Sequence, residues 1–199
     1  MILLPLTEVR KLYYEDGLSS VELANRFGVT VWQVIRFMKR NGLTRRTPQE
    51  SNNLRFERQK PSFKLKQTLT NHDERLKIAS SMLYWAEGVK SGDGHVVDFP
   101  NSDPKMILLY LKFLRKVCRI NESKLRVLLY CYANQSSNEL INYWSHIMQI
   151  PSVQFQKPYV RKDYNPNGRK MLYGLVHIRY NDTKLFRQVV EWIELYKNI

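Results

Sequence analysis

Residues 19–42 read SSVELANRFGVTVWQVIRFMKRNG, and this stretch predicts two short helices joined by a tight turn. Ser19 and Glu22 have the three-residue spacing of a capping box, which opens a helix by satisfying its first free N–H groups. Gly28 is expected to end that helix, because glycine adopts the left-handed backbone conformation at little steric cost. Thr30 can then cap the second helix. The sequence therefore predicts a compact pair of helices near the start of the chain.

The small and apolar residues inside this stretch suit a helix-turn-helix. Ala24 is small enough to let the two helices approach, and Val34 is placed to pack into the angle between them. A preceding helix is expected, with Thr7 as its cap and Gly17 at its end. Over residues 18–42 the sequence resembles the helix-turn-helix of bacterial regulators and recombinases. That resemblance implies that the second helix of the pair enters the major groove of DNA by its N-terminal face.

The outward positions of that second helix are the candidates for contact with DNA. Gln33 and Arg36 have side chains that can read the edges of adenine and guanine, respectively. Trp32 could stack on the DNA or pack on the next domain, and an ordinary solvated helix face is the alternative for the whole set. The expected DNA contacts of this region are Thr30, Trp32, Gln33, Arg36, Lys39, Arg40, Arg45 and Arg46.

The charge of the chain points to a polyanionic partner. The 199 residues include 32 Lys and Arg against 18 Asp and Glu, a net charge of +14, while 43% hydrophobic residues indicate a folded protein. Residues 39–66 carry +7 of that charge and residues 157–170 carry +4. A charge excess gathered in two segments is typical of a protein that follows the phosphates of a nucleic acid. Double-stranded DNA is the predicted partner, and a basic linker plus a basic loop without a ligand is the alternative.

Three segments are expected along the chain. Residues 1–46 predict a small all-α helix-turn-helix domain, and residues 47–70 predict a basic linker because they lack a sustained hydrophobic period. That linker either lies along DNA or serves as a flexible spacer. Residues 71–199 predict an α+β domain with helices on one face of a mixed or antiparallel sheet. Helices are expected at 72–87, 103–118 with Ser102 or Asp103 as cap, 136–148 and from 182, and strands at 95–99, 124–133, 152–157 and 171–180.

Several classes of protein are excluded or disfavoured by what the chain lacks. No apolar run approaches the ~20 uncharged residues of a membrane span, and the first residues do not resemble a secretion signal. A cytoplasmic, nucleoid-associated protein is therefore expected. Cys118 and Cys131 lack the spacing of a metal site, so two buried free thiols are predicted.

Residues 80–88, SSMLYWAEG, form the segment that bears on chemistry. A helix is expected to end there with Glu87 as its last residue before Gly88. A carboxylate at the negative end of a helix costs about 0.3 to 1 kcal/mol unless a cation offsets it. Magnesium is one such cation, because it prefers hard oxygen ligands. A plain helix stop with an exposed Glu87 is the alternative.

This segment resembles the LAGLIDADG motif of homing endonucleases. Leu83, Ala86 and Gly88 match the fourth, seventh and ninth letters, and Glu87 stands in place of the catalytic aspartate; Ser80, Ser81, Met82 and Trp85 depart from the motif. In that family two such helices pack together and their acids hold magnesium at the scissile phosphates. One motif per chain implies a homodimer and a nearly palindromic target, with the small Ser80 and Ser81 permitting close helix approach.

The resemblance also implies roles for the basic segment of the second domain. The sheet of such proteins contacts the major groove, so DNA contacts are expected from the strands and loop between 152 and 180. Lys157 and Lys162 are candidates to stabilise the pentavalent phosphate or simply to anchor phosphates. The full set of implied residues is Glu87, Lys157 and Lys162 for catalysis, Glu87 and Gly88 for magnesium, and Arg161, Arg169 and Lys170 for DNA binding.

These observations predict site-specific binding of double-stranded DNA with magnesium-dependent cleavage of phosphodiester bonds by a homodimer. The alternative is a non-catalytic, DNA-binding transcription regulator that keeps the same fold. A transposase or recombinase ranks last, because no acidic triad or nucleophilic Ser or Tyr stands out by its spacing.

Overall fold

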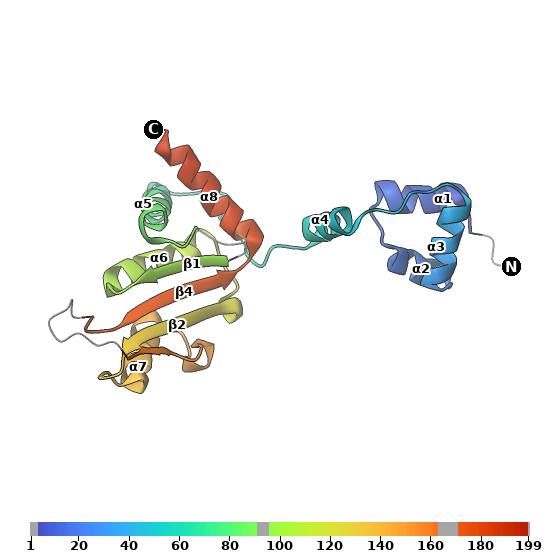
Figure 1. Cartoon of the computed structure of the whole chain (residues 1–199). Helices are drawn as coiled ribbons and strands as arrows, with labels where there is room; N and C mark the ends of the chain where they lie inside the picture. The colour runs from blue at the N-terminus through green and yellow to red at the C-terminus, as the bar shows by residue number, and fades with distance from the viewer. Residues whose placement is uncertain (1–3, 91–95, 163–170, 199) are drawn as a thin grey trace. The chain divides into compact units, whose positions relative to one another are not determined.

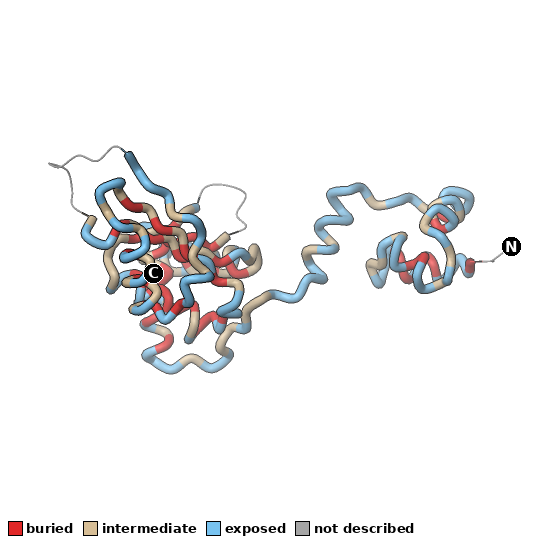
Figure 2. The backbone as a smooth tube through the Cα atoms, turned by 90° about the horizontal axis from the view of Figure 1, so that it is seen from below, coloured by how far each residue is buried: buried red, intermediate tan, exposed pale blue. Residues whose placement is uncertain are grey.

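The computed structural model describes residues 4–90, 96–162 and 171–198 (Figure 1). The chain divides into two compact units, Met1–Lys60 and Pro61–Ile199. Each unit has its own hydrophobic core, and Figure 2 shows the buried residues gathered inside each of them. Within the described residues, no helix has both the length and the apolar character that crossing a bilayer requires.

The first unit is all α-helical within the described residues. Its first helix begins at Leu6, directly after Pro5, so Thr7 lies inside the helix and does not cap it as expected. Proline is well suited to this position because it adds no free N–H group at a helix start. The helices are α1 (Leu6–Arg10), which continues into a wider π-helical turn (Lys11–Glu15), α2 (Ser20–Phe27), α3 (Val31–Arg40) and α4 (Pro48–Arg58).

The boundaries between α2 and α3 confirm the expected turn signals. Ser19 and Glu22 form a complete capping box at the start of α2. Gly28 has a left-handed φ of 64°, and Thr30 caps α3 with a second complete capping box that includes Gln33. A small apolar core closes behind these helices, formed by Leu4, Val9, Leu12, Tyr13, Leu23, Ala24, Val34 and Met38.

Residues 47–70, which the sequence predicts to form a linker, contain a helix in the structure. Residues 48–58 form α4, which begins with a capping box between Thr47 and Glu50 and has Pro48 in its first turn. Residues from Pro61 onward belong to the second unit, where the Ser62 hydroxyl donates to an Asp182 carboxylate oxygen at 2.6 Å. A hydrophobic period could not reveal α4, because none of its residues is buried.

The second unit confirms an α+β fold, with a four-stranded mixed sheet in the order β1-β4-β2-β3. Strands β1 and β2 each pair antiparallel to β4, and β3 pairs parallel to β2. Asp103 caps α6 as expected. The elements are α5 (Asn71–Glu87), β1 (Val96–Asn101), α6 (Pro104–Lys116), β2 (Leu125–Tyr132), α7 (Ser137–Met148), β3 (Tyr159–Arg161), β4 (Leu175–Asn181) and α8 (Thr183–Lys197), with short 3₁₀ turns at Glu122–Lys124 and Ser152–Gln154.

The prediction of a strand at residues 152–157 is wrong, because the strand forms further along the chain. Residues Ser152–Gln154 make a 3₁₀ turn, Phe155 makes one isolated bridge to Val127, and β3 follows at Tyr159–Arg161. Pro151 precedes the turn, and its fixed φ favours a turn over a strand start.

One face of the sheet is covered by helices and the other is open (Figure 1). Along β2 the side chains alternate between buried and more accessible, which is the pattern of a sheet with one covered face. The buried positions of β1, β2 and β4 share one core with Trp144 of α7 and with residues of α5, α6 and α8. Cys118 and Cys131 are buried and free in this core, as the sequence predicts.

Candidate nucleic-acid interface

Helix α3 presents a basic and aromatic face to solvent. The Trp32 side chain is 64% exposed, and the Arg36 guanidinium lies 5.1 Å from the centre of its ring. Lys39 and Arg40 are exposed on the last turn of the same helix. Val34 and Met38 are fully buried and hold the opposite side of α3 against the core. This face can therefore meet a polyanion without disturbing the packing of the unit.

The capping box at the start of α3 occupies part of the expected reading face. The Gln33 carboxamide oxygen accepts hydrogen bonds from the Thr30 backbone N–H at 2.8 Å and from the Thr30 hydroxyl at 3.1 Å. An adenine contact needs both the oxygen and the nitrogen of a glutamine carboxamide. Arg36 is therefore better placed than Gln33 to read a base from this helix.

The arginines after α3 have different surroundings. Arg45 is exposed, whereas Arg46 is half-buried and lies over the Tyr13 ring with its guanidinium 4.1 Å from the ring centre. The Arg46 side chain also donates to the Leu18 carbonyl oxygen. Arg46 thus fastens the chain after α3 to the helical core, and Arg45 is the one of the two that is exposed to solvent.

The open face of the sheet in the second unit forms a second basic and aromatic surface. Residues paired across neighbouring strands point to the same side, so the register determines which side chains share that face. The Tyr130 ring lies 5.1 Å from the Tyr159 ring and 4.9 Å from the His177 ring. We name this surface the open sheet face; its residues are Asp98, Arg126, Leu128, Tyr130, Tyr132, Tyr159, Arg161, Leu175, His177 and Arg179.

One acid orients two of the basic groups on the open sheet face. The Asp98 carboxylate lies 2.8 Å from the His177 Nδ1 atom and 3.1 Å from the Arg179 Nε atom. Asp98 is only 8% exposed, so these neighbours compensate a carboxylate that has lost most of its water. The pair of contacts holds His177 and Arg179 in defined orientations on β4.

The described basic residues of the segment 157–170 lie in or next to the edge strand β3. Lys157, Arg161 and Lys162 are exposed there, and the Arg161 guanidinium lies 5.9 Å from the Tyr132 ring centre. Arg169 and Lys170 lie outside the described residues. Glu87 lies at the other side of the sheet, next to β1. Val89, two residues after Glu87, donates its N–H to the Asp98 carbonyl of β1 at 2.9 Å.

Strands β1 and β3 are the outer strands of the sheet, three inter-strand spacings apart, or about 14 Å. A single chain therefore does not bring Lys157 and Lys162 to a phosphate that Glu87 contacts. Their position at the sheet edge suits the anchoring of phosphates.

Glu87 is the last residue of α5, as predicted, and its side chain is exposed. Gly88 is buried in an extended conformation, and a Cβ atom there would come within 2.6 Å of the Tyr84 ring. Burial raises the pKa of the Tyr84 phenol to about 12, and this neutral hydroxyl donates to the Val89 carbonyl at 2.9 Å. Because Gly88 has no Cβ atom, the chain can pass close to the Tyr84 ring as it runs from the end of α5 to β1.

The expected cation at the end of α5 is supplied by the chain itself. The Lys90 ammonium donates to the Trp85 carbonyl oxygen in the last turn of the helix. A cation at this end stabilises a helix by about 0.3 to 1 kcal/mol. Lys90 therefore offsets part of the unfavourable position of Glu87.

Among the described residues, no set of side chains that could hold magnesium gathers around Glu87. Glu87 offers a hard carboxylate oxygen of the kind that magnesium prefers. Across residues 4–90, 96–162 and 171–198, no cluster of three or more His, Cys, Asp or Glu side chains could hold a metal ion. A magnesium site at Glu87 would need further oxygen ligands beyond those that the described residues bring together.

The serines of α5 do not lie where the resemblance implies. Ser80 and Ser81 are fully buried against the core of their own unit, and neither hydroxyl has a hydrogen-bond partner among the described residues. The exposed side of α5 instead carries Ile78 and Trp85, which are 39% and 44% exposed, together with Ala79, Met82 and Ala86. The expectation that the serines permit close approach of a second helix is thus wrong, because they point inward.

Comparison of this chain with protein-family models, curated proteins and solved structures found no match. Sequence reasoning did not single out Asp98, Arg126 and His177, which the structure places on the open sheet face. The two-residue alternation of β2 and β4 indicates which side chains leave the core. The pairing register, which brings Asp98 opposite Arg179, appears only in the folded sheet.

Proposed function

We propose that this protein binds double-stranded DNA site-specifically, with α3 and the open sheet face as its two DNA-contacting surfaces. The observation that carries this proposal is the open sheet face, where three arginines and three tyrosines lie on a surface that helices leave uncovered. A β-surface of this kind can enter the major groove of B-DNA. The net charge of +14 supplies the attraction to phosphates.

The first unit supports the proposal independently. Helices α2 and α3 are joined by a short turn at Gly28, as the proposed helix-turn-helix requires, and α3 carries Trp32 and Arg36 on its exposed face. We propose that Arg36 reads a guanine, while Lys39 and Arg40 contact phosphates. Two surfaces on one chain give a longer recognised sequence than either surface alone.

A homodimer is the proposed assembly, as in a LAGLIDADG-like arrangement. The exposed side of α5 has small residues, Ala79 and Ala86, two turns apart, with Ile78 and Met82 beside them. Small residues let helix backbones approach closely, and the neighbouring apolar side chains gain by leaving water. Packing α5 against its copy would bring the two Glu87 residues toward one twofold axis.

Magnesium-dependent cleavage of DNA is the proposed activity of such a dimer. Each Glu87 offers one carboxylate, with the Gly88 carbonyl beside it, and a scissile phosphate would complete the oxygen ligands. Magnesium bound there would supply the positive charge that stabilises the leaving oxygen. Lys157 and Lys162 are proposed to contact phosphates other than the one that is cleaved.

A non-catalytic, DNA-binding transcription regulator is the alternative function. The contact of Lys90 with the end of α5 favours it, because the helix end is then partly balanced without a metal. Both functions use the same DNA-contacting surfaces, and only cleavage requires the Glu87 carboxylate.

Cleavage of a randomised duplex library with magnesium tests the activity, with Glu87→Gln run beside the wild type. Defined double-strand cuts that vanish in Glu87→Gln, while gel-shift binding persists, are the result expected of a nuclease. Tight, sequence-selective binding without cuts by either protein would identify a regulator. Absence of binding to any duplex would contradict both functions.

A further inference from the structure

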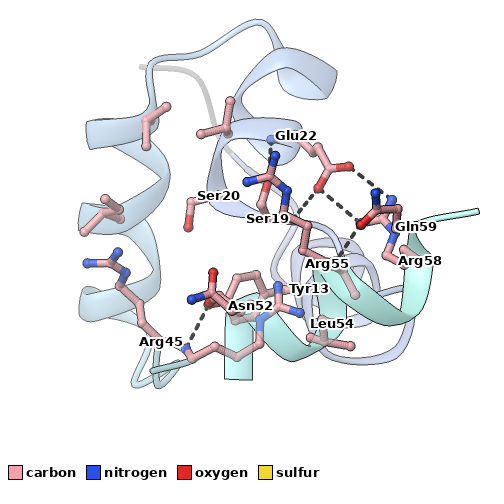
Figure 3. Close-up of a pocket in the computed structure, with 16 residues that line it drawn as sticks. Tyr13, Ser19, Ser20, Glu22, Arg45, Asn52, Leu54, Arg55, Arg58 and Gln59 are labelled. Atoms are coloured by element: carbon pink, nitrogen blue, oxygen red, sulfur yellow. Dashed lines mark hydrogen bonds and ion pairs between the residues drawn. The ribbon is translucent and has the colours of Figure 1, made fainter. Parts of the chain in front are cut away.

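A groove of about 890 Å³ opens within the first unit, between α2, α3 and α4 (Figure 3). Ser19 and Ser20 line it at the start of α2, and Val31 and Ile35 line it along one side of α3. Another wall comes from residues 45–59, which include the exposed arginines Arg45, Arg55 and Arg58. Helix α4, which the sequence does not predict, thus forms one side of the groove.

The groove carries a strong excess of positive charge. Its lining holds four arginines, Arg45, Arg46, Arg55 and Arg58, against the single acid Glu22. Charges gathered in a cleft attract an anion more strongly than the same charges spread over a surface. The chemistry of this groove therefore suits a ligand with several negative charges.

Two of the four arginines build the groove. Arg58 pairs with both Glu22 carboxylate oxygens at 3.1 and 3.2 Å, and Arg46 is fixed over Tyr13. Hydrogen bonds from Ser19, together with Arg58, lower the pKa of Glu22 to about 2, so its charge is committed to these partners. Arg45 and Arg55 stand exposed on the lining and are the two that a ligand would meet.

The groove borders the exposed face of α3. Val31 and Ile35, which line it, directly precede Trp32 and Arg36, and consecutive residues of a helix lie about 100° apart around its axis. When a helix lies in the major groove, the sugar–phosphate backbones pass along its two sides. A duplex that receives the Trp32 and Arg36 face therefore brings one of its backbones to the groove.

We propose that the groove binds the sugar–phosphate backbone of one DNA strand beside the major groove read by α3, with Arg45 and Arg55 as its phosphate contacts. The inference rests on the proposed DNA binding and adds α4 as a DNA-contacting element. Because phosphates are alike in every sequence, these arginines raise affinity without selecting bases.

The test measures binding to a labelled mixed-sequence duplex of about three helical turns, at salt concentrations between about 50 and 200 mM. The variants are Arg45→Gln with Arg55→Gln in one chain, and the same positions changed to Lys. Arg10→Gln, an exposed arginine of the same unit outside the groove, is the matched control. Circular dichroism of each variant verifies that the helices are intact.

The slope of log K against log salt is negative, and each lost phosphate contact reduces its magnitude by about 0.9. The double Gln variant is therefore expected to have a slope whose magnitude is smaller by about 1.8. The double Lys variant and Arg10→Gln are expected to keep the wild-type slope. A wild-type slope in the double Gln variant, or a loss confined to one DNA sequence, would overturn the inference and leave DNA binding intact. Failure of the wild type to bind duplex DNA at any of these concentrations would overturn both.

Discussion

Arg58 and Glu22 form a two-pronged ion pair, with the two terminal guanidinium nitrogens 3.1 and 3.2 Å from the two carboxylate oxygens. This contact fastens α4 to α2 and shapes one wall of the arginine-lined groove (Figure 3). Glu22 also accepts the Ser19 backbone N–H at 2.7 Å as part of the capping box. One carboxylate therefore stabilises both the start of α2 and the position of α4.

The stability of the first unit is expected to depend on pH through Glu22. Its pKa falls from 4.5 to about 2 on folding, because of the Ser19 hydrogen bonds and Arg58. The unfolded state then binds more protons between these values, so the free energy of unfolding declines as pH drops from about 4.5 to about 2. Glu22→Gln should flatten this decline in thermal unfolding followed by NMR of the α2 amides.

Glu15→Gln, at an exposed glutamate of the same unit, is the control for that measurement. It is expected to leave the pH dependence of the α2 amides as in the wild type. An equal flattening in both variants would contradict the role assigned to Glu22.

The buried hydroxyls of α5 provide a prediction about stability. Ser80 and Ser81 bury their hydroxyls without a hydrogen-bond partner in the part of the chain that the structure describes, and removing such a group relieves a desolvation cost. Ser80→Ala and Ser81→Ala should each raise the free energy of unfolding by about 1 kcal/mol. Ser145→Ala, which removes a 2.7 Å hydrogen bond to the Ile150 carbonyl, should lower it. Urea unfolding decides, and destabilisation by both α5 variants would refute the prediction.

Replacing Arg36 should separate base reading from phosphate contact. Arg36→Ala is expected to weaken binding to a selected site by about 1 to 3 kcal/mol while leaving binding to a scrambled duplex nearly unchanged. Lys39→Ala should weaken both alike and lower the salt slope by about 1. Fluorescence anisotropy on the two duplexes measures the difference. Equal losses for Arg36→Ala on both would show that it contacts only phosphate.

The exposed side of α5 predicts the oligomeric state. Ile78→Glu places a charge on each copy of the proposed helix pair, where desolvation and like-charge repulsion oppose association. Light scattering should give a dimer mass for the wild type and a monomer mass for this variant. Val153→Glu, at a position that is 87% exposed in a turn, should remain dimeric. A wild type that is monomeric with and without DNA would contradict the proposed assembly.

Local signals predicted some parts of the fold better than others. The capping boxes and Gly28 locate α2 and α3 because they act through neighbouring backbone groups. Helix α4 has a similar signal in Thr47-Pro48-Gln49-Glu50 but no apolar period, since it is held by Arg58 and not by burial. The orientation of Ser80 and Ser81 depends on which side of α5 meets the core. The spacing of apolar residues does not reveal that side, because the apolar Ile78 and Trp85 are exposed while the two serines are buried.

The candidate interface was predictable in its basic segments and not in its geometry. Charge counts identified the basic residues around α3 and β3, and the structure leaves Lys39, Arg40, Arg161 and Lys162 exposed. The open sheet face depends on pairing between Asp98 and Arg179, residues that lie far apart in the chain. Such register follows from tertiary packing, so the sequence alone could not assemble it.

Footprinting on a selected duplex tests the central claim, which is that α3 and the open sheet face both contact DNA. The wild type should protect two segments in each half-site. Arg36→Ala should lose protection of one segment, and Arg126→Gln with Tyr159→Ala should lose protection of the other. A single protected segment that survives the changes on the open sheet face, or no protected sequence at all, would contradict the account.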